Sequence, residues 1–170
     1  DNLLIIPGYE ICTVKAIEVH DKPCKFASAG DTVSLGITGI DTNNIGVGQF
    51  VCDPQKPIPY TNRFMAKIIT FKLRYPLTPG SAVTLQYQNV TVEATIIRLM
   101  ELLDKATGTV TRSKPRSVGD SVAALVAIKT AEPICIEMFN DNKQLGRFTL
   151  REDGQTIATG IVTKLLKRIP

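Results

Sequence analysis

Apolar and polar residues alternate with a period of two along most of the chain, as in β-strands that bury one face. Pro-Gly, Asp-Gly and similar turn sequences separate these runs. Many short strands with regular turns predict an all-β fold built of barrels or sandwiches. The predicted strands cover residues 3–6, 12–19, 32–38, 49–52, 63–73, 82–88, 90–103, 122–129, 133–138, 145–151 and 156–165.

One run allows a second interpretation. Residues 90–103 are long for a single strand, which must therefore curve or bulge. The end of this run, residues 96–104, also fits a helical period, but the β-rich surroundings favour a strand. A helix-dominated fold is the weaker alternative.

Charge and proline content divide the chain into two modules. Residues 1–62 carry four basic and seven acidic side chains, whereas residues 63–170 carry sixteen basic and nine acidic ones. The segment 53–59 is rich in proline, which stiffens the backbone and removes hydrogen-bond donors. We interpret this segment, with residues 60–62, as the link between modules at 1–62 and 63–170.

Composition excludes several classes of protein. Apolar residues make up 44% of the 170 positions, enough for folded cores, and no run reaches the length of a membrane helix. The four cysteines form no Cys-x-x-Cys pair and His20 is the only histidine, so a zinc site is not expected. Free thiols in a reducing compartment are the simplest interpretation. The start at Asp1, without Met or a signal peptide, indicates a piece of a longer protein.

Residues 145–160, with the sequence LGRFTLREDGQTIATG, predict a β-hairpin around an Asp-Gly turn. Alternation places Phe148 and Leu150 toward a core and Arg147, Thr149 and Arg151 on the opposite face. These outward side chains are candidates for partner binding, because arginine binds carboxylates and carbonyls with two hydrogen bonds. The simpler alternatives are a solvated face and an Arg151 that pairs with an acidic residue of the turn.

A second candidate is the basic loop that carries Arg112, Lys114 and Arg116. These cations favour contact with RNA, although no aromatic residues alternate with them as stacking platforms. The alternative is that the net charge only keeps the module soluble.

No catalytic chemistry is indicated. The chain lacks the Gly-Lys-Ser/Thr loop that binds nucleotide phosphates, and no nucleophile motif surrounds any serine. The lone His20 lies in a turn next to proline. We therefore expect no catalytic residues, no metal ligands and no enzyme activity.

The hairpin GRFTLR, its acidic turn and the following TIATG resemble the last domain of the translational GTPases related to elongation factor 1-alpha. The stretches CTVK at 12–15 and AGDTVSL at 29–35 are similar to the second domain of the HBS-like branch. The release-factor GTPases are the alternative branch. The resemblance implies two consecutive β-barrels of the translation-factor type: an incomplete second domain at 1–62, lacking its first strands, and a third domain at 63–170.

The resemblance also implies a function. The HBS-like factors are cytoplasmic and deliver a Pelota-type, release-factor-like protein to stalled ribosomes during no-go and non-stop mRNA surveillance. Partner contact is then expected at Gly146, Arg147, Thr149 and Arg151, with GTP and magnesium bound by a GTPase domain outside this sequence. The alternatives are a class I release factor as the partner in termination, and an RNA-binding β-barrel. No membrane partner is expected, and direct RNA contact is expected only on the ribosome.

Overall fold

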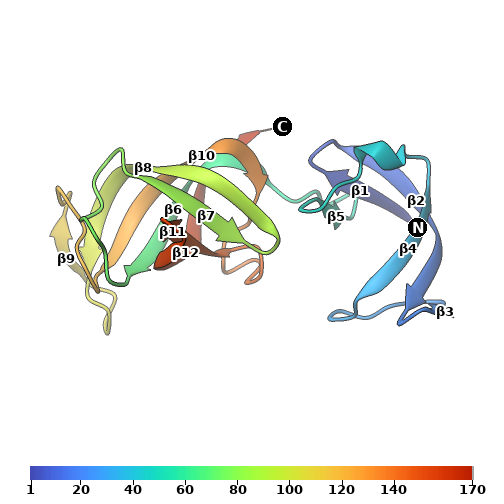
Figure 1. Cartoon of the computed structure of the whole chain (residues 1–170), viewed down its shortest axis with the longest axis horizontal. Coiled ribbons are helices and arrows are strands. Elements are labelled where there is room, and N and C mark those ends of the chain that lie inside the picture. Colours follow the sequence, from blue (N-terminus) through green and yellow to red (C-terminus); the bar gives the residue numbers. More distant parts are fainter. Residues whose placement is uncertain (170) are drawn as a thin grey trace. The chain divides into compact units, whose positions relative to one another are not determined.

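The computed structural model describes the backbone of residues 1–169 and the side chains of residues 1–166. It divides the chain into two compact units, Asp1–Ile58 and Pro59–Pro170. Both units consist of antiparallel strands, and the described residues contain no α-helix (Figure 1). The predicted all-β fold class is confirmed. None of the described segments is a helix with the length and apolar composition needed to cross a bilayer.

The first unit is an open five-stranded sheet. The strand β2 (Glu10–Val19) pairs with β1 and β3 along one edge and with β4 along the other, and β5 pairs with β1. Across residues 1–58, all of which are described, no pairing joins β4 to β5, so the sheet does not close. The other elements are β1 (Asn2–Ile6), β3 (Lys22–Cys24), β4 (Val33–Thr38), the 3-10 turn η1 (Thr42–Asn44) and β5 (Phe50–Cys52).

The second unit contains a closed six-stranded barrel. Its strands follow the order β10, β6, β12, β11, β7 and β8, and pairing of β8 with β10 completes the ring. The short β9 adds to β8 outside the ring. The bounds are β6 (Tyr60–Thr70), β7 (Ala82–Tyr87), β8 (Val90–Leu103), β9 (Val110–Ser113), β10 (Ala123–Cys135), β11 (Arg147–Glu152) and β12 (Gln155–Ile169).

The barrel core follows directly from the alternation of its strands. Phe64 and Ile68 on β6 face Phe148 and Leu150 on β11 and Leu85 on β7, and all of these side chains are at least 98% buried. The rings of Phe64 and Phe148 meet edge-on with centroids 5.7 Å apart, the arrangement that aromatic pairs prefer.

The two ends of the barrel meet on neighbouring strands. β6 and β12 are antiparallel, and their register runs from Ala158 opposite Thr70 to Ile169 opposite Tyr60. The first strand of the ring is therefore hydrogen-bonded to the last one along its whole length.

Several details differ from the sequence-based expectations. The two units divide between Ile58 and Pro59, and β6 begins at Tyr60, so the expected boundary after residue 62 lies inside β6. The turn expected at residues 20–23 is shorter: only His20 and Asp21 have positive φ, and Lys22–Cys24 is the strand β3.

The long run at 90–103 is a strand throughout, and the register of β8 against β10 shifts twice along it. The runs at 122–129 and 133–138 overlap one irregular strand, β10, whose register against β6 shifts between Lys129 and Ile134. All four cysteines are free: Cys12 and Cys135 are buried, and the other two are half-buried.

Candidate partner-binding face

Strand β11 has the two faces that its sequence predicts over most of its length. Phe148 and Leu150 are 2% and 0% exposed inside the barrel, whereas Arg147 is exposed and Thr149 is half-buried on the outside. Gly160 on β12 makes room for the Phe148 ring, since an added Cβ would lie 2.6 Å from its Cζ atom. The core packing of these side chains holds the outer face of β11 in place.

Arg147 borders two hollows on the outside of the barrel. The first, of about 430 Å³, is lined by Lys67 and Ile69 of β6, Thr159 and Ile161 of β12, and Phe139. The second, of about 280 Å³, lies toward β7 and is lined by Gln86, Gln88, Gln144 and Thr149, among others. The Arg147 guanidinium carbon lies 5.8 Å from the centroid of the Phe139 ring, a cation–π distance.

Cross-strand register explains why these side chains meet. Arg147 lies opposite Ile161 on β12, and Ile161 lies opposite Lys67 on β6. Two cations thus flank an apolar residue in one row across three strands. Sequence reasoning missed Lys67, Phe139 and Ile161, because alternation gives a residue's face but not the strand that lies beside it.

Gly146 is buried and serves packing. A Cβ at this position would overlap the backbone of Phe139, and the Gly146 N–H donates to the Asn142 carbonyl at 2.9 Å. The absent side chain therefore lets the segment before β11 fold back and bring Phe139 next to Arg147.

Thr149 and Arg151 make contacts within the barrel. The Thr149 hydroxyl donates to the carbonyl of Gln86 at 3.4 Å. Arg151 donates from Nη1 to the Gln86 side chain at 3.3 Å and from Nη2 to the carbonyl of Gly154, and its Nε is buried. The register shifts between Leu150 and Arg151, so this arginine folds over its own turn.

The expected alternative, in which Arg151 pairs with the acidic turn, is not found among the described residues. Asp153 instead lies 3.9 Å from Arg74, and both side chains are exposed. Such an exposed pair contributes about 0–1 kcal/mol. Arg147 is therefore the arginine of the hairpin that is available to a partner.

Arg112, Lys114 and Arg116 are all exposed, and none forms an ion pair within the part of the chain that the structure describes. Arg112 belongs to β9 and lies opposite Leu102, so the basic segment is partly a strand and not only a loop. The Lys114 N–H donates to the Met100 carbonyl at 2.8 Å. These three cations do not line either hollow beside Arg147.

The titratable groups with shifted pKa values have structural causes. Backbone and hydroxyl hydrogen bonds from Thr107, with the backbone N–H of Ala106, lower the pKa of Asp104 within its turn. Burial raises the pKa of Tyr87, whose hydroxyl donates to the carbonyl of Cys135 at 2.8 Å. His20 is exposed in a tight turn, and no cluster of His, Cys, Asp or Glu in the described residues could hold a metal.

The second unit is thus a closed antiparallel barrel whose outer surface carries a row of cationic and apolar side chains. The sequence model of the GTP-eEF1A C-terminal domain-like family matches residues 63–163. This chain belongs to that family, and it is similar to the C-terminal regions of translation factors. The predicted resemblance to translational GTPases is confirmed.

Three relatives describe the similarity. Protein HBS1 of Drosophila melanogaster is 42% identical over 165 residues, which are 97% of this chain and 25% of that protein. The eukaryotic peptide chain release factor GTP-binding subunit of Debaryomyces hansenii is 33% identical over 97% of this chain and 24% of its own length. The crystal structure of sup35 complexed with GDP has a TM-score of 0.91 at 30% identity, covering 98% of this chain and 41% of that chain. The chain spans about a quarter of the length of the first two relatives.

Proposed function

We propose that this chain is the C-terminal β-barrel region of an HBS-like ribosome-rescue GTPase and binds a Pelota-type, release-factor-like protein in the cytoplasm. The higher identity to HBS1, 42% against 33% for the release-factor subunit, supports the HBS-like branch. In this role the barrel holds the partner that is delivered to stalled ribosomes in no-go and non-stop mRNA surveillance.

The observation that carries the proposal is the position of Arg147. It is exposed at the border of two hollows, and its guanidinium lies against the face of Phe139. Ile161 and Ile69 supply apolar surface beside it, and Lys67 supplies a second cation. Interfaces are enriched in arginine and aromatic residues that are packed around their centre. This surface therefore suits a folded partner that presents carboxylates next to apolar side chains.

Replacement of one side chain tests this assignment. Arg147→Glu is expected to weaken binding of a purified Pelota-type protein at least about tenfold, or some 1.4 kcal/mol, because it places a carboxylate where the partner presents its own. Isothermal titration with the 170-residue chain measures the effect. The melting temperature is expected to stay the same, since Arg147 is exposed.

Arg116→Glu is the matched control, because it makes the same charge change on an exposed side chain away from both hollows. It is expected to leave the partner affinity unchanged. Equal binding by the wild-type chain and Arg147→Glu would place the partner site elsewhere on the barrel.

The second candidate is the same region of a release-factor GTPase, with a class I release factor as the partner. The 33% identity to the release-factor GTP-binding subunit over 97% of this chain supports this possibility. Parallel titrations with the two partner types distinguish the branches. Tighter binding of the class I release factor would replace the rescue assignment by a role in termination.

Ribosome contact through Arg112, Lys114 and Arg116 is a further part of the proposal. Their exposure and their lack of ion pairs in the described residues leave them available for phosphates. If they bind RNA, the affinity for ribosomes is expected to fall steeply as the salt concentration rises. Each charge reversal is then expected to make this dependence of affinity on salt less steep. A packed protein interface responds less to salt.

Nucleotide chemistry belongs to another part of the proposed whole protein. The residues present do not fit GTP and magnesium, because the chain has no phosphate-binding loop and the described residues include no metal-binding cluster. In this proposal the barrel region acts by binding its partner.

A further inference from the structure

A groove of about 700 Å³ lies on the outside of the barrel, across β12, β6, β10 and β8. Its apolar wall consists of Met65, Ile97, Met100 and Leu166, which come from three strands that are far apart in the sequence. None of the residues lining it belongs to β11 or lines the hollow beside Phe139. It is thus a surface separate from the proposed Pelota-binding face.

A small residue on a central strand accounts for the depth of the groove. Ala127 on β10 lies opposite Met65 on β6 and Arg98 on β8. Its methyl group cannot fill the space between these longer side chains, although the neighbours leave it only 5% exposed. Ala127 therefore forms the bottom of the groove, between the longer side chains of the neighbouring strands.

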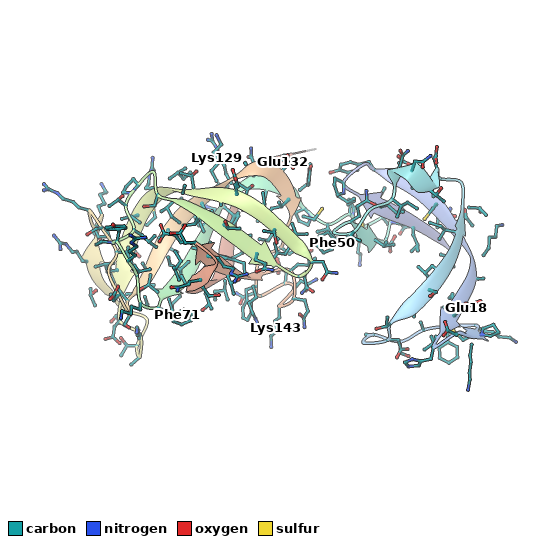
Figure 2. All side chains as sticks on the ribbon, in the orientation of Figure 1. Glu18, Phe50, Phe71, Lys129, Glu132 and Lys143 are labelled. Atoms are coloured by element: carbon teal, nitrogen blue, oxygen red, sulfur yellow. The ribbon has the colours of Figure 1, made fainter. Side chains whose placement is uncertain are left out.

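Three cations surround the bottom of the groove: Arg63, Arg98 and Lys129. All three are exposed, and Figure 2 shows the Lys129 side chain projecting outward from the barrel. Arg63 and Lys129 lie opposite each other on β6 and β10, an arrangement of like charges that is unfavourable without a counter-charge. No carboxylate lines the groove, and none of the three cations forms an ion pair among the described residues.

The apolar wall is accessible between these charges. Ile97 is 37% exposed and Leu166 is 44% exposed, and the two methionines beside them are half-buried. Methionine adapts its shape to irregular ligands, so a methionine-lined wall suits side chains of varied form. The groove therefore combines positive charge with adaptable apolar surface.

We propose that this groove binds an acidic, apolar peptide segment of a partner protein. Glutamate or aspartate side chains of the segment would neutralise Arg63, Arg98 and Lys129, and leucine-like side chains would cover Ile97 and Leu166. RNA fits less well, because its phosphates would leave the apolar wall exposed and no aromatic residue lines the groove to stack on a base. The proposal adds a second binding surface to the region and does not depend on the identity of the β11 partner.

The methionines provide a local readout. The chain has three: Met65 and Met100 line the groove, whereas Met138 is half-buried in the segment before β11. Methyl NMR of the full 170-residue chain, labelled at methionine, reports on the groove and on a site outside it in one spectrum. A synthetic peptide of alternating Glu and Leu is expected to shift the Met65 and Met100 signals saturably and to leave Met138 unchanged.

Matched peptides test the acidic and the apolar contributions to binding separately, and variants test the cations of the groove. A peptide of alternating Glu and Ser, and one of alternating Lys and Leu, are each expected to bind at least tenfold more weakly. The double variant Arg98→Glu with Lys129→Glu is expected to weaken binding of the Glu-Leu peptide at least tenfold. Arg112→Glu with Arg116→Glu, which reverses two exposed cations outside the groove, is expected to leave the affinity unchanged.

Three results would overturn the proposal. The first is the absence of saturable shifts at Met65 and Met100 with the Glu-Leu peptide. The second is an equal effect of both double variants, which would mean non-specific attraction to the basic module. The third is tighter binding at these methyl groups by a single-stranded RNA oligonucleotide or by vesicles of anionic phospholipid, which would assign the groove to those ligands instead.

Discussion

The two units of the chain are built from the same alternating strands but bury very different amounts of apolar surface. In the first unit only Leu4, Ile5, Ile6 and Cys12 are buried, whereas every strand of the closed ring in the second unit contributes to a continuous core. Large apolar side chains stay exposed in the first unit, among them Phe26 at 77% and Val47 at 95%. Strand content alone therefore does not determine a core.

Closure of the sheet into a barrel explains the difference in burial between the two units. In the second unit the pairing of β8 with β10 joins the two ends of the sheet, so that all inward side chains face one another. In the first unit β4 and β5 form no such pair. A closed ring also leaves no free strand edges within it, whereas an open sheet exposes them.

The largest difference between the two units is expected when each is expressed alone and unfolded by heat. Residues 59–170 expressed alone are expected to unfold in one cooperative thermal transition, because the closed barrel contains its own core. Residues 1–58 alone are expected to show no cooperative transition, because four buried side chains cannot offset the entropy of ordering the chain. Calorimetry of both fragments measures this. A sharp heat-absorption peak from residues 1–58 would show that closure is not the deciding difference.

Substitution of one phenylalanine in each unit compares their stabilities within the intact chain. Phe148→Ala is expected to lower the free energy of unfolding of the barrel by about 3–5 kcal/mol, because it removes a buried ring that packs on Phe64 and Gly160. Phe26→Ser is the matched change in the first unit, where the ring is mostly exposed, and it is expected to change stability by less than about 0.5 kcal/mol.

Urea unfolding followed by amide NMR resolves the two units separately. Similar losses for both variants would mean that exposure does not describe the contribution of Phe26, and the contrast between the units would then be weaker than their burial indicates.

The smallest expected effect depends on pH. Burial raises the pKa of Tyr87 in the folded barrel above the unfolded value of about 10. The neutral phenol is favoured by folding, so its contribution is complete below pH 10 and is lost as pH rises further. Between pH 9 and pH 11 the free energy of unfolding is expected to fall by about 1.4 kcal/mol on this account.

Tyr87→Phe tests this assignment, because it removes the titrating group and keeps the ring. The variant is expected to lose the hydrogen bond to the Cys135 carbonyl and to show a correspondingly smaller fall above pH 10. Urea unfolding at the two pH values measures the difference. An equal fall in the variant would assign the pH dependence to other groups.

Much of the fold follows from the sequence because strand alternation is local. The inward positions of Phe148 and Leu150 and most strand ranges could be predicted in this way. The closing pair of β8 and β10 could not, since it joins residues far apart in the chain and depends on two shifts in register. The boundary between the units differs from the predicted one, because β6 begins at Tyr60, directly after the proline-rich segment, and not after residue 62.

The candidate site was predicted only in part, for the same reason. Arg147 is exposed as alternation requires, but the register shift after Leu150 turns Arg151 toward Gln86 and Gly154. Gly146 packs against Phe139, a role that alternation does not predict, and its contact with a partner stays a prediction. Whether the outer row binds Pelota remains a prediction that the Arg147→Glu titration tests.

The pairing of Tyr60 with Ile169 has a mechanical consequence. A pulling force applied to the two ends of the barrel acts on neighbouring antiparallel strands at the same edge of their shared ladder. The hydrogen bonds between β6 and β12 then carry the load one after another, as in a zipper, and not all at once as in shear. The barrel is thus expected to open under tension along this seam, from Tyr60 toward Thr70, at a force far below what its closed core would suggest.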